Sequence, residues 1–353
     1  MQPSLNGGQA GLIEQVIAPG LCVGCGACVG LCPYQEYKDG RIVVIDRCHA
    51  ENSRCYLICP QCAGGTEKPG GVQEEISVPD GIGPCLEIHM ARGTDDEITA
   101  GGQYGGMVSS LLVRSLESGV VDNVVLTTKG GSEAPAGTLA RSREEILACA
   151  GSRYNSAGTL AAMNRAYGNG VTRMAVVGLP CQMIALERLA KMQPDGAERS
   201  RAVELKLGLF CTWALDYRSL RHFLKSEGID APARKYDIPP PPAARFDVDT
   251  LQGMRHFPLD EIRPAIQKGC RICRDMTAEY ADISIGAAEG YPGWNTVLVR
   301  TETGRRLFAD SCAANLVEVR PLPEANLEHL AEAARNKRRR GEEALSEIRG
   351  GRS

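Results

Sequence analysis

The N-terminal region contains Cys22-Val-Gly-Cys25-Gly-Ala-Cys28-Val-Gly-Leu-Cys32-Pro33, a run in which four cysteines fall within eleven residues. Gaps of two residues let successive thiolates reach the corners of one polynuclear centre while the backbone wraps around it. Gly24 and Gly26 allow the turns that this wrapping needs and leave backbone amides close to the sulfurs. Pro33 ends the wrap. The run therefore predicts a small fold built around a metal centre.

The spacing C-x-x-C-x-x-C-x-x-x-C-P is that of bacterial ferredoxins, in which the fourth cysteine binds a second iron–sulfur cluster. A structural zinc site is the alternative, but zinc ligands usually come in separated pairs. Nine of the 15 cysteines lie in the first 85 residues. Without a visible export signal, such clustering favours metal binding or redox chemistry over disulfides.

A second cysteine run, Cys48-x6-Cys55-x3-Cys59-Pro60-Gln61-Cys62, repeats the C-x-x-x-C-P ending but lacks a middle cysteine, since position 51 is Glu51. We assign one 4Fe–4S cluster to Cys22, Cys25, Cys28 and Cys59. We assign a second cluster to Cys32, Cys48 and Cys55, with Cys62 as the favoured fourth ligand. A ligand other than cysteine, or a single cluster, is the alternative. Residues 41–46, between the two runs, are predicted to form a short strand.

The composition excludes several classes of protein. The 353 residues, 43% of them hydrophobic, suffice for one large or two ordinary domains. A net charge of −3 argues against a nucleic-acid partner bound by bulk charge. No run of 18 apolar residues predicts a membrane span, and the first twenty residues lack the features of a signal peptide. We therefore expect a cytoplasmic protein without a nucleic-acid partner and without a membrane span.

The pattern after residue 85 indicates an α/β fold. Pro79, Gly81, Gly83 and Pro84 predict a linker, so residues 1–85 are expected to form a ferredoxin-like iron–sulfur domain and 86–322 a larger α/β domain. Helix and strand signals alternate there. Strands are predicted at 124–126, 174–178, 205–210, 282–286 and 295–300, and helices at 107–116, 181–192 and 216–227. Residues 239–242 are predicted to form an exposed loop, and 323–353 a charged helical tail, whose basic residues 335–340 form a solvated end or a partner contact.

Four further cysteines fall at the ends of predicted elements in the α/β domain. Cys181 lies where a strand passes into a helix, where backbone amides and the helix dipole stabilise a thiolate. Cys211 ends another strand, and Cys270 and Cys273 form a C-x-x-C in a predicted loop. Because the carboxyl ends of parallel strands share one sheet edge, the four could converge. Two buried core cysteines beside a small zinc or redox pair are the alternative.

Two glycine-containing segments precede predicted helices. Gly101, Gly102, Gln103, Tyr104, Gly105 and Gly106 form the first, and residues 150–157 form the second. Amides at a helix start bind phosphate, Arg153 could meet a phosphate, and Tyr154 could stack on a ring. Each segment alone is more often an ordinary helix cap. Before helices of one sheet edge, the two together favour a dinucleotide such as FAD.

Taken in order, these motifs resemble the beta subunit of coenzyme F420-reducing hydrogenase and its flavin-containing relatives. The resemblance extends from Cys22 to about Leu307. Beyond the first cysteine run it rests on Gly102-Gln103-Tyr104-Gly105-Gly106, Ser152-Arg153-Tyr154-Asn155-Ser156, Gly178-Leu179-Pro180-Cys181-Gln182, Phe210-Cys211, Lys268-Gly269-Cys270-Arg-Ile-Cys273-Arg-Asp275, Ala281-Asp282-Ile283-Ser284-Ile285-Gly286 and Gly293-Trp294. The family commonly has GQDGG, GTPCQ and SKY where this chain has Tyr104, Leu179 and Arg153. These differences leave the electron partner open.

The resemblance implies FAD and a 4Fe–4S cluster in the α/β part. The implied cluster ligands are Cys181, Cys211, Cys270 and Cys273. Three clusters are then expected, two of them N-terminal, and Cys85, Cys149 and Cys312 are left as ordinary thiols. The expected FAD-binding residues are Gly101, Gly102, Gln103, Gly105, Gly106, Ser152, Arg153, Tyr154, Asn155, Ser156, Gln182 and Trp294.

The function that the resemblance implies is electron transfer in an oxidoreductase subunit. Iron–sulfur clusters pass single electrons, a deazaflavin or nicotinamide takes a hydride, and a flavin connects the two. The expected partners are other redox subunits and a carrier such as coenzyme F420, NAD(P)H or ferredoxin. Two alternatives are a relay subunit of a hydrogenase, formate dehydrogenase or heterodisulfide reductase complex without its own hydride substrate, and a non-redox zinc protein. No acid–base pair is needed, so no catalytic residue is assigned.

Overall fold

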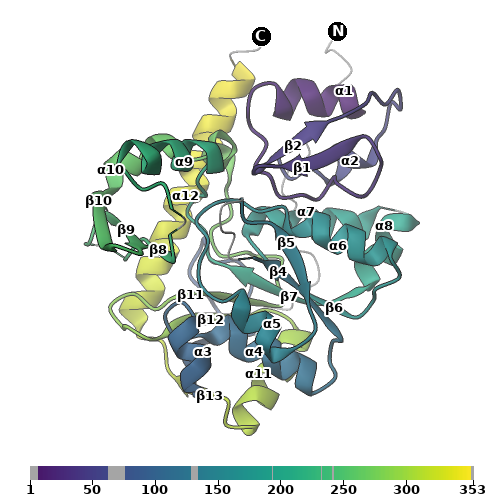
Figure 1. The fold of residues 1–353 in the computed structure, drawn as a ribbon. Coiled ribbons are helices and arrows are strands. Elements are labelled where there is room, and N and C mark those ends of the chain that lie inside the picture. Colours follow the sequence, from purple (N-terminus) through teal and green to yellow (C-terminus); the bar gives the residue numbers. More distant parts are fainter. Residues whose placement is uncertain are drawn as a thin grey trace.

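An eight-stranded mixed sheet forms the centre of the molecule (Figure 1). The computed structural model describes residues 7–62, 76–128, 134–192, 194–231, 233–240 and 242–350. The strand order is β13-β3-β12-β11-β7-β6-β4-β5. The strands are β3 (Glu87–Gly93), β4 (Asn123–Thr127), β5 (Gly137–Ala140), β6 (Met174–Gly178), β7 (Val203–Leu209), β11 (Ile283–Ala287), β12 (Asn295–Val299) and β13 (Val317–Arg320).

The middle of this sheet is parallel. Strand β4 pairs in parallel with β6, β6 with β7, and β7 with β11, whereas β5, β12, β3 and β13 pair antiparallel with their neighbours. Two antiparallel pairings separate β3 from β11, so β3 runs in the direction of the parallel strands. The carboxyl ends of β3, β6, β7 and β11 therefore lie along one edge of the sheet, where ligands of open α/β sheets bind.

Helices cover both faces of the sheet. Along β4, Val124 and Leu126 face one apolar core and Val125 faces the other, as the twofold alternation of a strand requires. The first face is covered by α4 (Met107–Glu117), α5 (Arg143–Ala148) and α11 (Glu302–Ala313). The second is covered by α6 (Thr159–Gly168), α7 (Pro180–Lys191) and α8 (Asp195–Arg201). The short α3 (Asp96–Gly101) follows β3.

The N-terminal unit packs onto the second face. It consists of α1 (Gln9–Leu12), a π-helical turn η1 (Ile13–Ile17), the hairpin β1 (Gln35–Lys38) and β2 (Arg41–Val44), and α2 (Arg54–Ile58). On α6, Asn164 Nδ2 donates to Ala27 O at 2.9 Å and to Val29 O at 2.8 Å. The apolar residues of the N-terminal unit share one core with α6 and α7, so the unit is fixed on the sheet domain.

A small three-stranded sheet, in the order β10-β9-β8, lies beside the main one. It contains β8 (Lys235–Asp237), β9 (Arg245–Thr250) and β10 (Gly253–Pro258), flanked by α9 (Tyr217–Ser226), α10 (Leu259–Ile262) and the 3-10 turn η2 (Arg263–Ala265). Leu220, Leu224, Phe246 and Val248 form its separate core. The layer thus places β8 near the main sheet (Figure 1).

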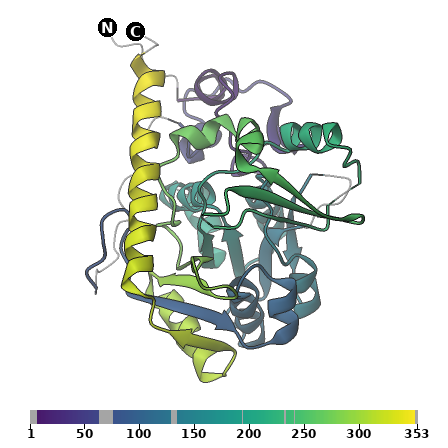
Figure 2. The ribbon, with the colours of Figure 1, turned by 90° about the vertical axis from the view of Figure 1, so that its left-hand side faces the viewer.

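The long C-terminal helix α12 (Glu324–Gly350) runs along one side of the molecule, as Figure 2 shows. Near its start, Leu327 and Ala331 pack with Ile82 and Leu298. Near its end, Leu345 packs against the core shared by the N-terminal unit. The helix therefore contacts both the sheet domain and the N-terminal unit.

Arg300 holds the linker region against the sheet. Its side chain is fully buried, and its guanidinium donates to the carbonyl oxygens of Pro84 at 2.8 Å, Ile82 at 3.0 Å and Thr277 at 3.2 Å. A buried arginine is tolerated because its donors are satisfied in this way. The linker predicted at residues 79–84 is thus anchored to the loop that follows Cys273.

Most elements predicted from periodicity are present, among them β4, β6, β7, β11, β12, α4, α7, α9 and α12. The strands β3, β5, β8, β9, β10 and β13 were not predicted. Strand β3 and the short helix α3 come directly before the glycine-rich segment, and neither was predicted from the sequence. The C-x-x-C segment, predicted as a loop, begins in a 3-10 turn, η3 (Lys268–Ile272). Within the described chain, no helix is both long and apolar enough to cross a membrane.

Candidate cofactor sites

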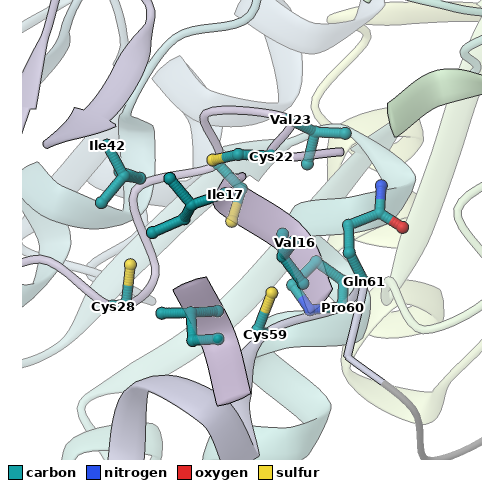
Figure 3. A pocket seen from close by; sticks show the side chains of 11 residues that line it. Val16, Ile17, Cys22, Val23, Cys28, Ile42, Cys59, Pro60 and Gln61 are labelled. Atoms are coloured by element: carbon teal, nitrogen blue, oxygen red, sulfur yellow. The ribbon is translucent and has the colours of Figure 1, made fainter. Parts of the chain in front are cut away.

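The first thiol group lines a hollow in the N-terminal unit. Cys22, Cys25, Cys28 and Cys59 share it with apolar side chains that include Val16. The hollow holds about 360 Å³ of space, its open mouth included. In Figure 3 the sulfurs of Cys22, Cys28 and Cys59 point toward this common space. The four cysteines that the sequence spacing assigned to one cluster are therefore the four that line this hollow.

Local backbone geometry explains the wrap. Gly24 and Gly26 have φ of 63° and 81°, in the left-handed region that favours glycine. A Cβ on Gly26 would lie 2.8 Å from Ala161 N, at the start of α6. Both glycines are therefore needed, for the turn itself and for the close approach of the cysteine run to the sheet domain.

The electrostatics of this hollow suit a cationic occupant. Burial, and then the neighbouring Cys59, raises the pKa of Cys25, and burial together with Cys25 raises the pKa of Cys28. A hydrogen bond from Cys62 acts in the opposite direction and lowers the pKa of Cys59. Crowded thiolates in an apolar hollow repel one another, and a bound metal centre removes that penalty because its positive charge favours the thiolate form.

The second thiol group is less complete. The thiol of Cys55 lies near those of Cys32 and Cys62, and Cys62 also contacts Cys59 of the first group. Cys48 is held by its backbone N–H, which donates to Gln9 Oε1 at 2.8 Å. Among the residues that the structure describes, no hydrogen bond joins Cys48 to another thiol. The side chain of Gln35 is buried close to Cys55; burial raises the pKa of Cys55, and the Gln35 amide acts in the opposite direction.

All 15 cysteines lie in the described ranges and are free thiols. Within those ranges, no three His, Cys, Asp or Glu side chains converge closely enough to surround a single metal ion. The thiols of the first group instead stand around a shared hollow. Four thiolates arranged around a volume are the donor set of a cubane cluster.

The third thiol group lies at the carboxyl edge of the main sheet. Cys181 follows β6, Cys211 follows β7, and Cys270 and Cys273 lie in and just after η3. Burial raises the pKa of Cys181, and the thiols of Cys25, Cys273, Cys211 and Cys270 raise it further. Burial likewise raises the pKa of Cys211 to about 11 and that of Cys270 to about 12. The fold thus brings together the four cysteines that the family resemblance implies.

The first and third groups adjoin each other. Among the thiols that raise the pKa of Cys181, Cys25 of the N-terminal unit has the largest effect. Gln182, next to Cys181, donates from Nε2 to Ala157 O at 3.0 Å and to Cys25 O at 3.4 Å, and its Oε1 accepts from Leu179 N at 2.8 Å. Gln182, predicted to bind the cofactor, therefore lies between the two thiol groups with its amide engaged by protein.

The glycine-rich segment meets β8 of the small sheet. Asp237 at the end of β8 accepts from Gln103 Nε2 at 2.7 Å and from Tyr154 Oη at 3.1 Å. Burial and then Asp237 raise the pKa of both Tyr104 and Tyr154, so both phenols are neutral at ordinary pH. One carboxylate thus joins the two segments that were predicted to bind FAD.

The two segments also lie close together at their glycines. A Cβ on Gly151 would lie 3.7 Å from Gly101 O, and one on Gly101 would lie 3.9 Å from Ala150 Cβ. At the other end of the second segment, Gln267 Nε2 donates to Ser156 Oγ at 2.5 Å. Because Gln267 directly precedes η3, this segment spans the distance from the glycine-rich loop to the third thiol group.

Several buried polar atoms in these segments have no partner in the described structure. They are Gln103 Oε1, Arg153 Nε and Asn155 Nδ2. The guanidinium of Arg153 donates from Nη1 only to Ser152 O, and burial lowers its pKa. Buried polar groups are normally satisfied. An arginine fork and two amides left open beside a glycine-rich loop fit a bound diphosphate and a polar ring system.

Other predicted flavin residues have roles within the protein. A Cβ on Gly105 would lie 2.8 Å from Asn295 Oδ1 and 3.1 Å from Ala91 O, so tight contact with the sheet already requires glycine there. Gly106, with φ of 67°, starts α4, and a Cβ on Gly102 would lie 3.0 Å from Ile98 O. Trp294 is buried, with guanidinium groups of Arg92 and Arg320 over its ring at 4.7 Å and 4.3 Å.

Sequence reasoning missed three residues of these sites: Asp237, Gln267 and Lys337. Lys337, on α12, is 3% exposed and donates to Cys211 O at 2.6 Å. Burial acts to lower the pKa of Lys337, but Cys273, Cys211, Asp275 and Cys270 raise it above its ordinary value. None of the three lies in a recognisable motif, because each reaches its site only through the tertiary fold.

These features define a class: an α/β protein that gathers cysteines at the carboxyl edge of a mixed sheet, beside two joined loops with open polar groups. Two sequence models of the coenzyme F420 hydrogenase/dehydrogenase beta subunit match the chain, the N-terminal one over residues 88–164 and the C-terminal one over 171–325. They cover about two thirds of the sequence. The chain belongs to this family, as its motifs indicated.

Individual relatives agree. The coenzyme F420 hydrogenase subunit beta of Methanothermobacter thermautotrophicus is 31% identical over 69% of this chain and 87% of its own length. The coenzyme F420-dependent sulfite reductase of Methanocaldococcus jannaschii is 28% identical over 94% of this chain, which spans 53% of that enzyme. A chain of the F420-reducing NiFe hydrogenase complex of Methanosarcina barkeri superposes with a TM-score of 0.71 at 27% identity, covering 77% of this chain and 95% of that one.

Proposed function

We propose that this chain is an electron-transfer flavoprotein subunit of an oxidoreductase, binding FAD and three 4Fe–4S clusters. In this proposal residues 1–85 form a ferredoxin-like unit that holds two clusters. Residues 86–322 hold FAD and the third cluster. Electrons pass between the clusters and FAD, and from there to or from a hydride carrier such as coenzyme F420.

The observation that carries the proposal is the proximity of the first and third thiol groups: Gln182, next to Cys181, donates to Cys25 O at 3.4 Å, and the Cys25 thiol acts on the pKa of Cys181. The first group belongs to the N-terminal run and the third to the sheet edge, so their proximity supports a path for electrons between these two parts of the chain. The segment 150–157 extends that path, because Ser156 is bonded to Gln267 beside η3 and Tyr154 to Asp237 at the glycine-rich loop. The arrangement thus supports electron passage from the N-terminal unit to a flavin.

Individual residues along this path have distinct roles in the proposal. A bound flavin supplies the exchange between single electrons and a hydride. Arg153 is placed to neutralise phosphate charge, while Asp237 orients Gln103 and Tyr154. Around the first thiol group, Val16 and Ile17 exclude water, and Gln182 holds the two thiol groups at a fixed separation.

The test is anaerobic purification followed by iron, sulfide and flavin analysis. The proposal expects about twelve irons per chain, from four per cubane, and one FAD. About four irons would remove both N-terminal clusters from the proposal, and zinc without iron would replace it with a structural metal site.

The electron partner is then identified by anaerobic reduction assays with reduced coenzyme F420, NADH, NADPH and reduced ferredoxin. Turnover with coenzyme F420 is the expected result, since relatives named for coenzyme F420 match this chain. If no soluble hydride carrier turns over, and the flavin is reduced only by a protein partner, the chain is a relay subunit.

A further inference from the structure

Among the residues that the structure describes, Lys337 is the one buried lysine, and it lies against the third thiol group. Its ammonium group donates to Cys211 O at 2.6 Å and lies close to Cys211, Cys270, Cys273 and Asp275. Within the described chain, no carboxylate forms an ion pair with it at 4.0 Å or less. A buried ammonium group is costly unless negative charge faces it, and here that charge comes from the thiol group together with Asp275.

The carboxylates nearest to this lysine are committed elsewhere. Asp275 accepts hydrogen bonds from the backbone N–H groups of Thr277, Ala278 and Glu279, at 2.8 to 3.0 Å. Glu279 pairs with Arg338 at 2.7 Å. These contacts hold the two carboxylates in place, and the charge of Lys337 acts on the thiols as well as on Asp275.

Helix α12 holds Lys337 rigidly in place. One turn further along the helix, a Cβ on Gly341 would lie 2.7 Å from Cys273 O. On the N-terminal side, Arg335 Nη1 donates to Asp80 O at 3.1 Å. The glycine permits close approach and the arginine fixes the register, so the backbone of Lys337 is held beside the third thiol group and its side chain reaches Cys211 O.

This helix lies beyond the part of the chain that the family models match, which ends at residue 325. The cysteines of the third group lie inside the matched part and Lys337 lies outside it. The family models therefore account for the thiols of this site but do not include Lys337.

We propose that Lys337 is a positioning residue that raises the reduction potential of the cluster held by Cys181, Cys211, Cys270 and Cys273; this rests on the proposed function. Four thiolates give such a cluster net negative charge, and each electron that enters adds one more negative charge. An adjacent buried cation stabilises the reduced form more than the oxidised form. One electron is transferred, and the ammonium group keeps its proton throughout.

The test compares Lys337→Gln, Lys337→Met and Lys337→Arg in the full chain. Glutamine keeps a donor for Cys211 O but removes the charge, methionine removes both, and arginine keeps the charge. Arg339→Met is the matched control, because this side chain is 69% exposed on the same helix. The readouts are iron and sulfide content, followed by a redox titration monitored by electron paramagnetic resonance.

The expected result is full iron in every variant and a more negative midpoint potential for one cluster in the Gln and Met variants. A tenfold change in the ratio of reduced to oxidised cluster at fixed potential, about 59 mV for one electron, is the expected minimum. The Arg variant and the Arg339→Met control should keep the wild-type potential.

Two results would overturn the role of Lys337: full iron with unchanged potentials in the Gln variant, or loss of one cluster's iron in the Gln and Arg variants alike. The second result would make Lys337 a structural contact. Wild-type protein without iron would instead refute the proposed function itself, so the two failures are distinguishable.

Discussion

Replacing Arg153 with methionine is expected to change the flavin-bound and flavin-free forms in opposite directions. In the structure, the guanidinium is half-buried, its Nε has no partner, and Nη1 donates to Ser152 O. Burial lowers the pKa of this guanidinium, so the site is unfavourable for the charge until an anion arrives. Methionine has a similar length, so it fills the space without the charge.

The size of the effect follows from the contacts that the guanidinium has available. A hydrogen bond to a charged group contributes about 1.5–3 kcal/mol. Loss of one such bond to phosphate corresponds to a decrease in FAD affinity of roughly 10- to 150-fold. The free protein loses a buried atom without a partner, so its free energy of unfolding should stay equal or rise by about 1 kcal/mol.

The assay is a fluorescence titration of deflavinated protein with FAD, together with thermal unfolding with and without FAD. Arg165→Met is the control, because Arg165 is 57% exposed and pairs with Glu36 at the surface; its replacement should leave the FAD affinity unchanged. Equal loss of stability in both forms of Arg153→Met, or unchanged FAD affinity, would refute the phosphate role of Arg153.

Three further predictions concern the thiols, the glycine-rich loop and the linker. Cys62→Ser should lower iron by about four per chain and spare the other clusters, since a lost thiolate weakens its own cubane; unchanged iron and spectra would show another fourth ligand. Gly105→Val should lower the unfolding free energy by about 1–3 kcal/mol through overpacking while FAD per folded chain stays constant, whereas Gly101→Val, whose Cβ would make only an ordinary contact with Ala150 at 3.9 Å, should lose FAD and keep its melting temperature. Arg300→Met should cost about 3 kcal/mol in chemical denaturation, because it leaves buried carbonyl groups without donors; a cost as small as that of the exposed Arg306→Met would contradict this.

Local sequence determined much of the fold. The strands β4 and β6 contain continuous apolar runs, and β7 and β11 alternate apolar residues with polar or small ones. Helices α4 and α7 have apolar residues at helical spacing, so short-range periodicity was sufficient to predict all six elements. The first cysteine run determined its own geometry, because two-residue gaps and two glycines of positive φ bring its thiols around one hollow.

Two neighbouring strands at one side of the main sheet were harder to predict. Strands β3 and β13 contain charged residues such as Arg92 and Glu318, which pair with each other at 2.6 Å across the sheet. That pairing exists only when two segments more than 200 residues apart lie side by side. An isolated segment shows no strand signal when its stability comes from such a neighbour.

The sequence by itself determined which side chains supply the chemistry: twelve cysteines in spaced groups, and two polar glycine segments before helices. Only the tertiary structure decided how these groups adjoin. It brings Cys25 close to Cys181, bonds Asp237 to both glycine-containing segments, and places Lys337 against the third thiol group. The reason is physical. Covalent spacing fixes contacts within a few residues, whereas the meeting of distant residues depends on how apolar surfaces are buried between whole elements.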